Sequence, residues 1–178
     1  KGGDPFIFGR GGEEIAALAA EGLPFEVVPG VTAASGMAAY AGIPLTHRDH
    51  AQSCLFVTGH LKDGTLDLDW DALVRPKQTV VIYMGIGGLD EICRQLMAHG
   101  LPGSTPAAVV RNATLDDQRV VQAQVATLAI ACHTAAIKPP ALIVIGSVAS
   151  LTTQMDWFSV ARRAAGPQGL SLVRSGNS

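Results

Sequence analysis

Three segments, two of them rich in glycine, contain the residues whose types and spacing best suit the binding of a small molecule. They are residues 2–5 (GGDP), 84–88 (MGIGG) and 112–114 (NAT), and each lies at the end of an expected strand or the start of an expected helix. In α/β proteins, ligands bind beyond the carboxyl ends of strands, where glycine lets backbone N–H and C=O groups reach them. Together these segments favour a cleft for a nucleotide-like molecule, although glycine in many loops serves only a tight turn.

The sequence contains none of the common motifs for covalent, metal or nucleotide chemistry. GxSxG, HExxH, the P-loop and GxGxxG are all absent. His47 and His50 are the only histidines close together, and no cysteine or pair of carboxylates lies beside them at ligand spacing, so we interpret them as part of a solvated loop and predict no metal. The cysteines are too widely spaced for a zinc site or a disulfide framework, and we expect buried, reduced thiols: Cys54, Cys93 and Cys132.

Alternating helix and strand patterns predict an α/β fold around these segments. The helix over residues 33–40 (AASGMAAY) consists mainly of small residues, which fits either tight packing on a sheet or a ligand at its N-terminus. Thr32 and Ser147 are predicted to cap the helices that follow them. Further helices are expected at 11–21, 71–74 and 89–97 and from 125, and strands at 24–28, 53–58, 79–83, 106–111, 118–122 and 141–145.

Length, composition and charge limit the class of protein. The chain has 178 residues, of which 48% are hydrophobic and 16% charged, so it can bury a core. A net charge of −2 gives no basic excess for phosphate contacts, which argues against a dedicated nucleic-acid binder. We find no apolar run long enough for a membrane span and no leader, and expect a cytoplasmic protein. We divide the chain into residues 1–46, 47–160 and a flexible tail, 161–178.

Seven segments, in order, resemble the signatures of the tetrapyrrole methylase family. The combination of GRGGEE with PLTHRD is most similar to the uroporphyrinogen-III C-methyltransferase branch, which includes the methylase module of siroheme synthase. The resemblance covers residues 1–151 and begins inside the first signature, so we expect an N-terminally truncated chain. The segments are KGGDPFIFGRGGEE (1–14), PGVTAASG (29–36), GIPLTHRD (42–49), VTGH (57–60), YMG (83–85), NATLDDQRVV (112–121) and PPALIVIGSV (139–148).

The resemblance implies both a fold and a reaction. Residues 1–46 would be the end of a first α/β domain, and residues 47–160 a second α/β domain with a mixed sheet. S-adenosylmethionine would lie in the cleft between them, in a homodimer. The implied reaction methylates C2 and C7 of uroporphyrinogen III and gives precorrin-2 and S-adenosylhomocysteine, for siroheme and cobalamin synthesis. The family's proposed acid and base residues would lie upstream of Lys1, so we assign no catalytic residue.

The resemblance also assigns residues to the cofactor. Asp4 would bind the cofactor's ammonium or a ribose hydroxyl, although the same side chain could simply close an Asx-type turn. Ala113 stands where the family often has glycine, and its methyl group is tolerable if its φ angle is negative. The residues assigned to the cofactor are Gly2, Gly3, Asp4, Ile7, Thr32, Ala33, Met84, Ala113, Pro140 and Ala141.

Four arginines beside the family motifs are candidates for binding the acceptor. They are Arg10, Arg48, Arg111 and Arg119, and arginine pairs with carboxylates bidentately, which suits an acceptor with eight carboxylates. Each could equally be an ordinary surface charge. Two other functions remain open: another precorrin methyltransferase of the same family, or a binding and dimerisation remnant without activity.

Overall fold

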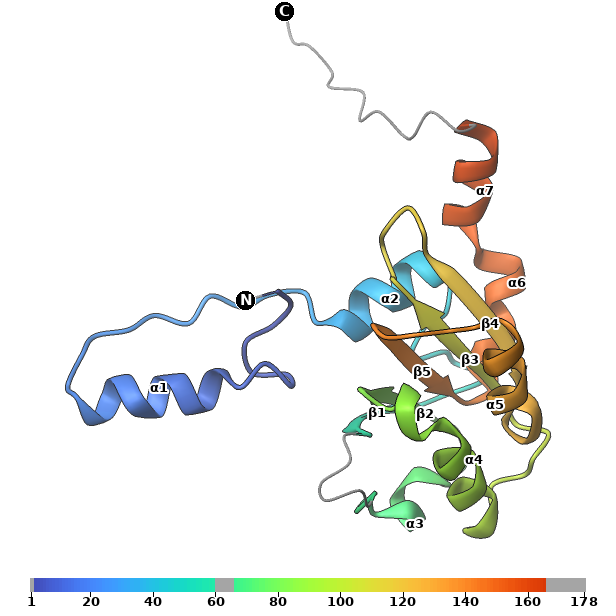
Figure 1. Ribbon diagram of the computed structural model, residues 1–178, viewed down its shortest axis with the longest axis horizontal. Coiled ribbons are helices and arrows are strands. Elements are labelled where there is room, and N and C mark those ends of the chain that lie inside the picture. Colours follow the sequence, from blue (N-terminus) through green and yellow to red (C-terminus); the bar gives the residue numbers. More distant parts are fainter. Residues whose placement is uncertain (1, 60–65, 166–178) are drawn as a thin grey trace, which may run out of the picture.

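A five-stranded mixed sheet forms the centre of the structure (Figure 1), a computed structural model that describes residues 2–59 and 66–165. Its strand order is β1-β2-β5-β3-β4; β1 pairs with β2 in parallel, and the other pairs are antiparallel. The predicted α/β class with a mixed sheet is therefore confirmed. Because β2 and β3 both run antiparallel to β5, β1, β2 and β3 end at one edge of the sheet, where β5 begins. The strands are β1 (Ser53–Thr58), β2 (Gln78–Tyr83), β3 (Pro106–Arg111), β4 (Arg119–Gln124) and β5 (Ala141–Ile145).

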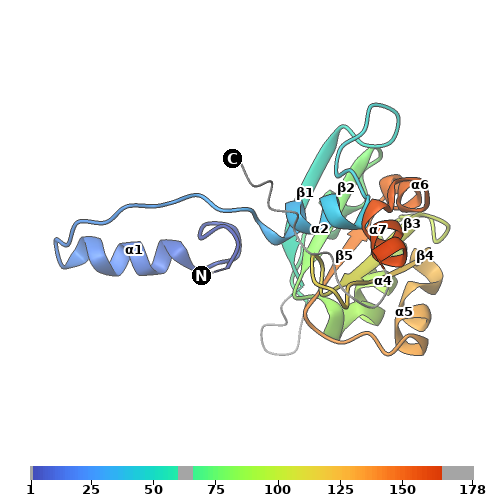
Figure 2. The same cartoon turned by 90° about the horizontal axis from the view of Figure 1, so that it is seen from above.

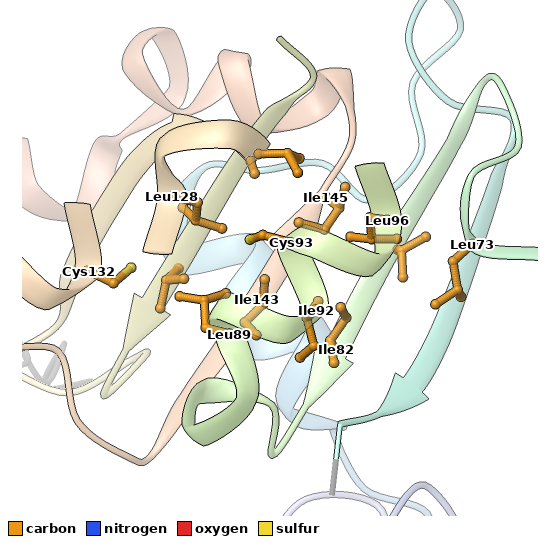
Figure 3. Packing of buried hydrophobic residues seen from close by; sticks show 14 of the residues in the cluster. Leu73, Ile82, Leu89, Ile92, Cys93, Leu96, Leu128, Cys132, Ile143 and Ile145 are labelled. Atoms are coloured by element: carbon orange, nitrogen blue, oxygen red, sulfur yellow. The ribbon is translucent and has the colours of Figure 1, made fainter. Parts of the chain in front are cut away.

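One face of the sheet is covered by α4 (Leu89–Ala98) and α5 (Val125–Thr134). The side chains between them and the sheet form the larger hydrophobic cluster, shown in Figure 3. Leu96 and Ile143 in this cluster have no exposed surface. The helix predicted from apolar residues at helical spacing is thus present, and Gly100 follows it with a φ of 96°, a conformation that glycine adopts without strain.

The opposite face of the sheet packs against α2 (Ala33–Ala41). Ala34 and Met37 have no exposed surface and belong to a second cluster with Val81 and Val144 of the sheet. The small residues of α2 allow this close approach, so tight helix–sheet packing is confirmed for this helix. Because α2 shares the core of the sheet, residues 33–41 pack with the second half of the chain, while the division into domains at residue 46 stays a prediction.

The remaining helices are short or lie at the periphery. The Tyr40 ring on α2 contacts two aromatic rings, those of Trp157 and Phe158 on the last helix, with centroids 5.1 and 4.9 Å away. This helix includes the first residues of the expected tail, and residues 166–178 lie outside the described part. The peripheral elements are α3 (Trp70–Leu73), η1 (Ile86–Gly88), η2 (Ser147–Leu151), α6 (Thr152–Met155) and α7 (Trp157–Ala165).

The N-terminal segment extends away from the sheet (Figures 1 and 2). It consists of a loop, α1 (Gly11–Ala20) and a connecting stretch that returns to α2. The strand predicted at residues 24–28 is wrong: the described chain forms no strand there, because no neighbouring strand supplies hydrogen bonds. Phe25 and Val28 consequently remain 48% and 71% exposed.

Both predicted helix caps are also wrong. Thr32 occupies the position before α2 but makes no capping bond; its hydroxyl lies 2.7 Å from the Tyr83 hydroxyl. Ser147 starts the 3-10 helix η2, and its hydroxyl donates to the carbonyl oxygen of His50 at 3.2 Å. In each case a partner distant in sequence takes the hydroxyl that would otherwise serve its own helix.

Candidate functional site

A cavity of about 960 Å³ opens at the sheet edge where β2 and β3 end. Such a volume is within the range of small-molecule sites, roughly 300 to 1,000 Å³. The N-terminal loop, the start of α2, η1, the β3–β4 turn and the start of β5 all contribute to its wall. All three segments identified in the sequence as ligand-binding candidates therefore meet at one cavity, as expected for an α/β protein.

Asp4 holds the N-terminal loop in place. Its Oδ1 accepts a hydrogen bond from the Phe6 amide at 2.8 Å, which forms the Asx-type turn considered from the sequence. Its Oδ2 accepts from the Gly30 amide at 3.1 Å. These two bonds, the Gly30 one foremost, lower the pKa of the Asp4 carboxyl, so it stays negatively charged. Each oxygen keeps a lone pair for a ligand.

Gly30 lets two segments of the cavity wall approach closely. A Cβ atom at this position would lie 2.3 Å from the Gly3 carbonyl oxygen, a contact that a real side chain cannot make without displacing the backbone. Gly3 itself has a φ of 77°. The backbone of the N-terminal loop therefore depends on glycine at both positions.

Tyr83 fixes the N-terminus of α2 against the end of β2. Its side chain is 7% exposed, and its hydroxyl accepts a hydrogen bond from the Ala34 amide at 2.9 Å while contacting the Thr32 hydroxyl. The Phe8 ring lies 4.7 Å from the Tyr83 ring, centroid to centroid. One buried phenol thus connects three walls of the cavity: the N-terminal loop, α2 and the sheet.

Several non-glycine residues of the cavity wall adopt left-handed backbone conformations. Met84, directly after β2, has a φ of 54°, and Asn112 and Thr114, after β3, have φ angles of 48° and 73°. Such conformations are uncommon outside glycine and gather at functional sites. Ala113 is not among the residues with a positive φ, so its methyl group meets no backbone strain at the position where the family often has glycine.

All ten residues assigned to the cofactor line this cavity, although their contact with a ligand stays a prediction. The structure adds Phe8, Gly36, Tyr40, Tyr83 and Thr114, which were not assigned from the sequence. For Tyr83 a signal was present, because a tyrosine in a buried apolar strand needs a partner for its hydroxyl. Phe8, Gly36 and Thr114 lie inside segments singled out from the sequence, but nothing in residue type or spacing distinguished them from their neighbours, and Tyr40 had no signal.

None of the four candidate arginines lines the cavity. Arg10 is paired with Glu13 at 2.6 Å and is 78% exposed, and Arg48 is exposed. Arg111 lies opposite Arg119 in the β3–β4 register. Because side chains alternate between the two faces of a strand, Arg111 lies on the same sheet face as Val109, the face covered by α4 and α5, and Arg119, its register partner, lies there too. Val110 lies on the opposite face and lines the cavity. Their role in binding an acceptor stays a prediction.

The cysteines and histidines lie elsewhere. Burial raises the pKa of Cys54, Cys93 and Cys132 to about 11, and all three thiols are free. The rings of His47 and His50 contact each other edge to face at 4.9 Å. Within residues 2–59 and 66–165, no three His, Cys, Asp or Glu side chains gather as a metal site, and no helix has the length and apolar character to cross a membrane.

Comparison with known proteins identifies the family. Residues 1–129 match the family described as Tetrapyrrole (Corrin/Porphyrin) Methylases. The chain belongs to this family. Siroheme synthases of Nitrosospira multiformis and Methylobacillus flagellatus are each 62% identical to this chain, over 158 and 159 residues respectively, which is 89% of the chain. The chain spans about a third (34%) of the length of these curated relatives.

Solved structures of other tetrapyrrole methylases share the fold. Uroporphyrin-III C-methyl transferase from Thermus thermophilus, complexed with S-adenyl homocysteine, is 39% identical, with a TM-score of 0.72 over 84% of this chain and 65% of that one. A cobalt precorrin-4 methyltransferase is 28% identical, with a TM-score of 0.75 over 83% of this chain and 62% of that one.

Proposed function

We propose that the cavity binds S-adenosylmethionine and that the chain serves the methylation of uroporphyrinogen III at C2 and C7, giving precorrin-2. The observation that carries the proposal is the meeting of ten residues, assigned by family motif from five separate stretches of sequence, in one cavity. The Thermus thermophilus structure complexed with S-adenyl homocysteine supports this choice of ligand. Homodimerisation and a cytoplasmic location remain predictions from the resemblance.

The residues of the cavity wall fit the chemical parts of this cofactor. Asp4 presents a carboxylate whose pKa is lowered, which suits the ammonium of the methionine part or a ribose hydroxyl. The N-terminus of α2, at Thr32 and Ala33, carries partial positive charge, which suits the methionine carboxylate. Apolar side chains such as Met84 and Leu142 offer a surface for the adenine ring.

The proposed methyl transfer depends on the orientation of the two reactants more than on covalent catalysis by the protein. S-adenosylmethionine would supply an electrophilic methyl group on sulfur. Attack of an electron-rich pyrrole carbon on this methyl carbon, in line with its bond to sulfur, would break that bond and release S-adenosylhomocysteine, and the acceptor would then lose a proton to a base. The cavity would hold the donor through backbone groups of the strand ends and turns that line it. Apolar residues of the wall, Ile7 and Met37 among them, would exclude water from the methyl group. Holding both reactants in one geometry accounts for much of the rate of such transfers.

A second candidate function is methylation of a later precorrin. It is favoured by the TM-score of 0.75 with the cobalt precorrin-4 methyltransferase, but the higher identity of 39% with the uroporphyrin-III enzyme supports the first candidate. The position of the new methyl group distinguishes them. With ¹³C-methyl-labelled S-adenosylmethionine and uroporphyrinogen III, we expect ¹³C resonances on C2 and C7 of the product. Labelling at any other carbon, or labelling only when a precorrin is supplied, would exclude the first candidate.

A further inference from the structure

Gln118 connects two walls of the cavity without lining it. It immediately precedes β4, and its side-chain amide makes two hydrogen bonds in opposite directions. Its Oε1 accepts from the Thr114 amide at 2.8 Å, and its Nε2 donates to the Tyr40 carbonyl oxygen at 3.1 Å. One side chain therefore spans from the β3–β4 turn to the C-terminal end of α2.

The β3–β4 turn needs such support. Asn112 and Thr114 both have left-handed φ angles, and Thr114 is β-branched, for which this conformation is strained. Strained residues persist only where the surroundings hold them in more than one way. Three interactions inside the turn help: Asn112 Nδ2 donates to Asp117 at 2.6 Å, the Leu115 amide donates to the Asn112 carbonyl at 3.1 Å, and the Gln118 amide donates to the Leu115 carbonyl at 2.9 Å. Gln118 alone ties the turn to α2 by a hydrogen bond between the described residues.

The position of this turn determines the width of the cavity. Thr114 lines the cavity from the turn, and Gly36 and Tyr40 line it from α2. A Cβ atom on Gly36 would lie 3.5 Å from the Thr114 Cγ2 atom, so the turn and the helix approach van der Waals contact here. A turn released from α2 would lose this approach, and the wall that it forms would move relative to the helix.

We propose that Gln118 is a positioning residue for the cofactor: by tying the β3–β4 turn to α2 it keeps two walls of the cavity at the separation that the ligand requires. This inference rests on the proposed function, because it concerns the same cavity. It assigns to Gln118 no contact with the ligand and no part in the chemistry. The residue's effect is transmitted through Thr114 and Tyr40.

Gln118→Glu is the variant that isolates this role, and Gln122→Glu is its matched control. Glutamate keeps an oxygen that can accept from Thr114 but places a second oxygen against the Tyr40 carbonyl. Gln122 lies on β4 and donates a partly buried hydrogen bond to the Ala149 carbonyl at 2.8 Å, away from the cavity wall. Both changes remove one amide donor and add one negative charge, so a general loss of stability affects them alike.

The test is S-adenosylhomocysteine binding to this chain by calorimetry, with unfolding midpoints measured in parallel. We expect the Kd of Gln118→Glu to rise about tenfold, and that of Gln122→Glu to stay within about twofold of the parent value. Protonation of the carboxylate introduced by Gln118→Glu would restore a donor, so the ratio of variant to parent Kd should fall between about pH 8 and about pH 5.5. The neighbouring carboxylates of Asp116 and Asp117 are present in the variant and in the parent alike, so their effect is common to both Kd values.

Each outcome bears on the inference separately from the proposed function. No binding by the parent chain would contradict the proposed function and remove the site that Gln118 is said to position. Binding by the parent together with equal Kd values for the two variants would overturn the inference alone. The inference would also be overturned if the Kd values of the two variants rise only in step with the decrease in their unfolding midpoints. Should Gln118→Glu fail to fold, Gln118→Met removes both hydrogen bonds without a charge, and parent-like binding by it would also overturn the inference.

Discussion

Replacing Tyr83 with phenylalanine tests how the cavity is held together. The change removes one oxygen atom and leaves the ring, which packs against Phe8 at 4.7 Å and Phe56 at 6.0 Å. The lost hydroxyl accepts from the Ala34 amide at 2.9 Å and contacts the Thr32 hydroxyl at 2.7 Å. Because Thr32 and Ala34 are buried, water cannot readily replace the phenol.

The size of the effect follows from these contacts. Removing one partner of a buried hydrogen bond costs about 1–3 kcal/mol, because the remaining group is left unsatisfied. We therefore expect the free energy of unfolding to fall by about 2 kcal/mol, which lowers the melting temperature by roughly 4–8 °C for a chain of this length. The N-terminus of α2 loses its connection to the sheet, so S-adenosylhomocysteine should also bind several-fold more weakly.

Urea unfolding of Tyr83→Phe beside Tyr40→Phe measures this effect. Tyr40 also lines the cavity, but its hydroxyl forms no hydrogen bond with any residue that the structure describes. Its replacement should change the free energy of unfolding by less than about 0.5 kcal/mol. Equal effects of the two substitutions, or a Tyr83→Phe chain as stable as the parent, would refute the assignment of the phenol as the link between α2 and the sheet.

Three further predictions concern stability, association and the N-terminal loop. Burial raises the pKa of Cys93 and Cys132 to about 11, so the folded chain disfavours their thiolates. The free energy of unfolding should stay level up to about pH 8.5 and then fall towards about pH 11, by at most about 1.4 kcal/mol per pH unit for each thiol. Urea unfolding at a series of pH values measures this loss. A loss no steeper for the parent than for a variant without these two thiols would contradict the prediction. Phe25→Ser should reduce self-association in sedimentation velocity experiments, because Phe25 is 48% exposed in a segment that has no strand partner. An unchanged sedimentation profile would argue against Phe25 as part of an association surface. Gly30→Ala should abolish S-adenosylhomocysteine binding because its Cβ meets the Gly3 oxygen at 2.3 Å, whereas Gly12→Ala, with open space around it, should bind like the parent.

Most of the sheet could be predicted from local sequence. The strands at residues 53–58, 106–111 and 141–145 have the predicted bounds, because each is an apolar run between turn residues and lies inside or against the core. The segment at residues 24–28 has equally suitable residue types, yet no strand forms there. A strand exists only with a hydrogen-bonding neighbour, and residue types in one segment do not reveal whether that neighbour is present.

Ten residues of the cavity wall could be named from the sequence, but the hydrogen bonds that hold the wall together could not. Family motifs assigned all ten of the cofactor candidates that line the cavity. The bonds that hold its walls join residues far apart in sequence: Tyr83 with Thr32 and Ala34, and Gln118 with Tyr40. Local patterns indicate a cap at Thr32, but the tertiary contact with the phenol takes its hydroxyl instead. Such competition is decided by packing, which only the folded structure shows.

Titration of S-adenosylhomocysteine into the chain by calorimetry tests the central claim most directly. If the cavity at the ends of β2 and β3 is the cofactor site, the parent chain should bind one equivalent, saturably and with micromolar strength, and Gly30→Ala should not. Absence of saturable binding to the parent chain, or binding unchanged by Gly30→Ala, would contradict the assignment of this cavity to the cofactor.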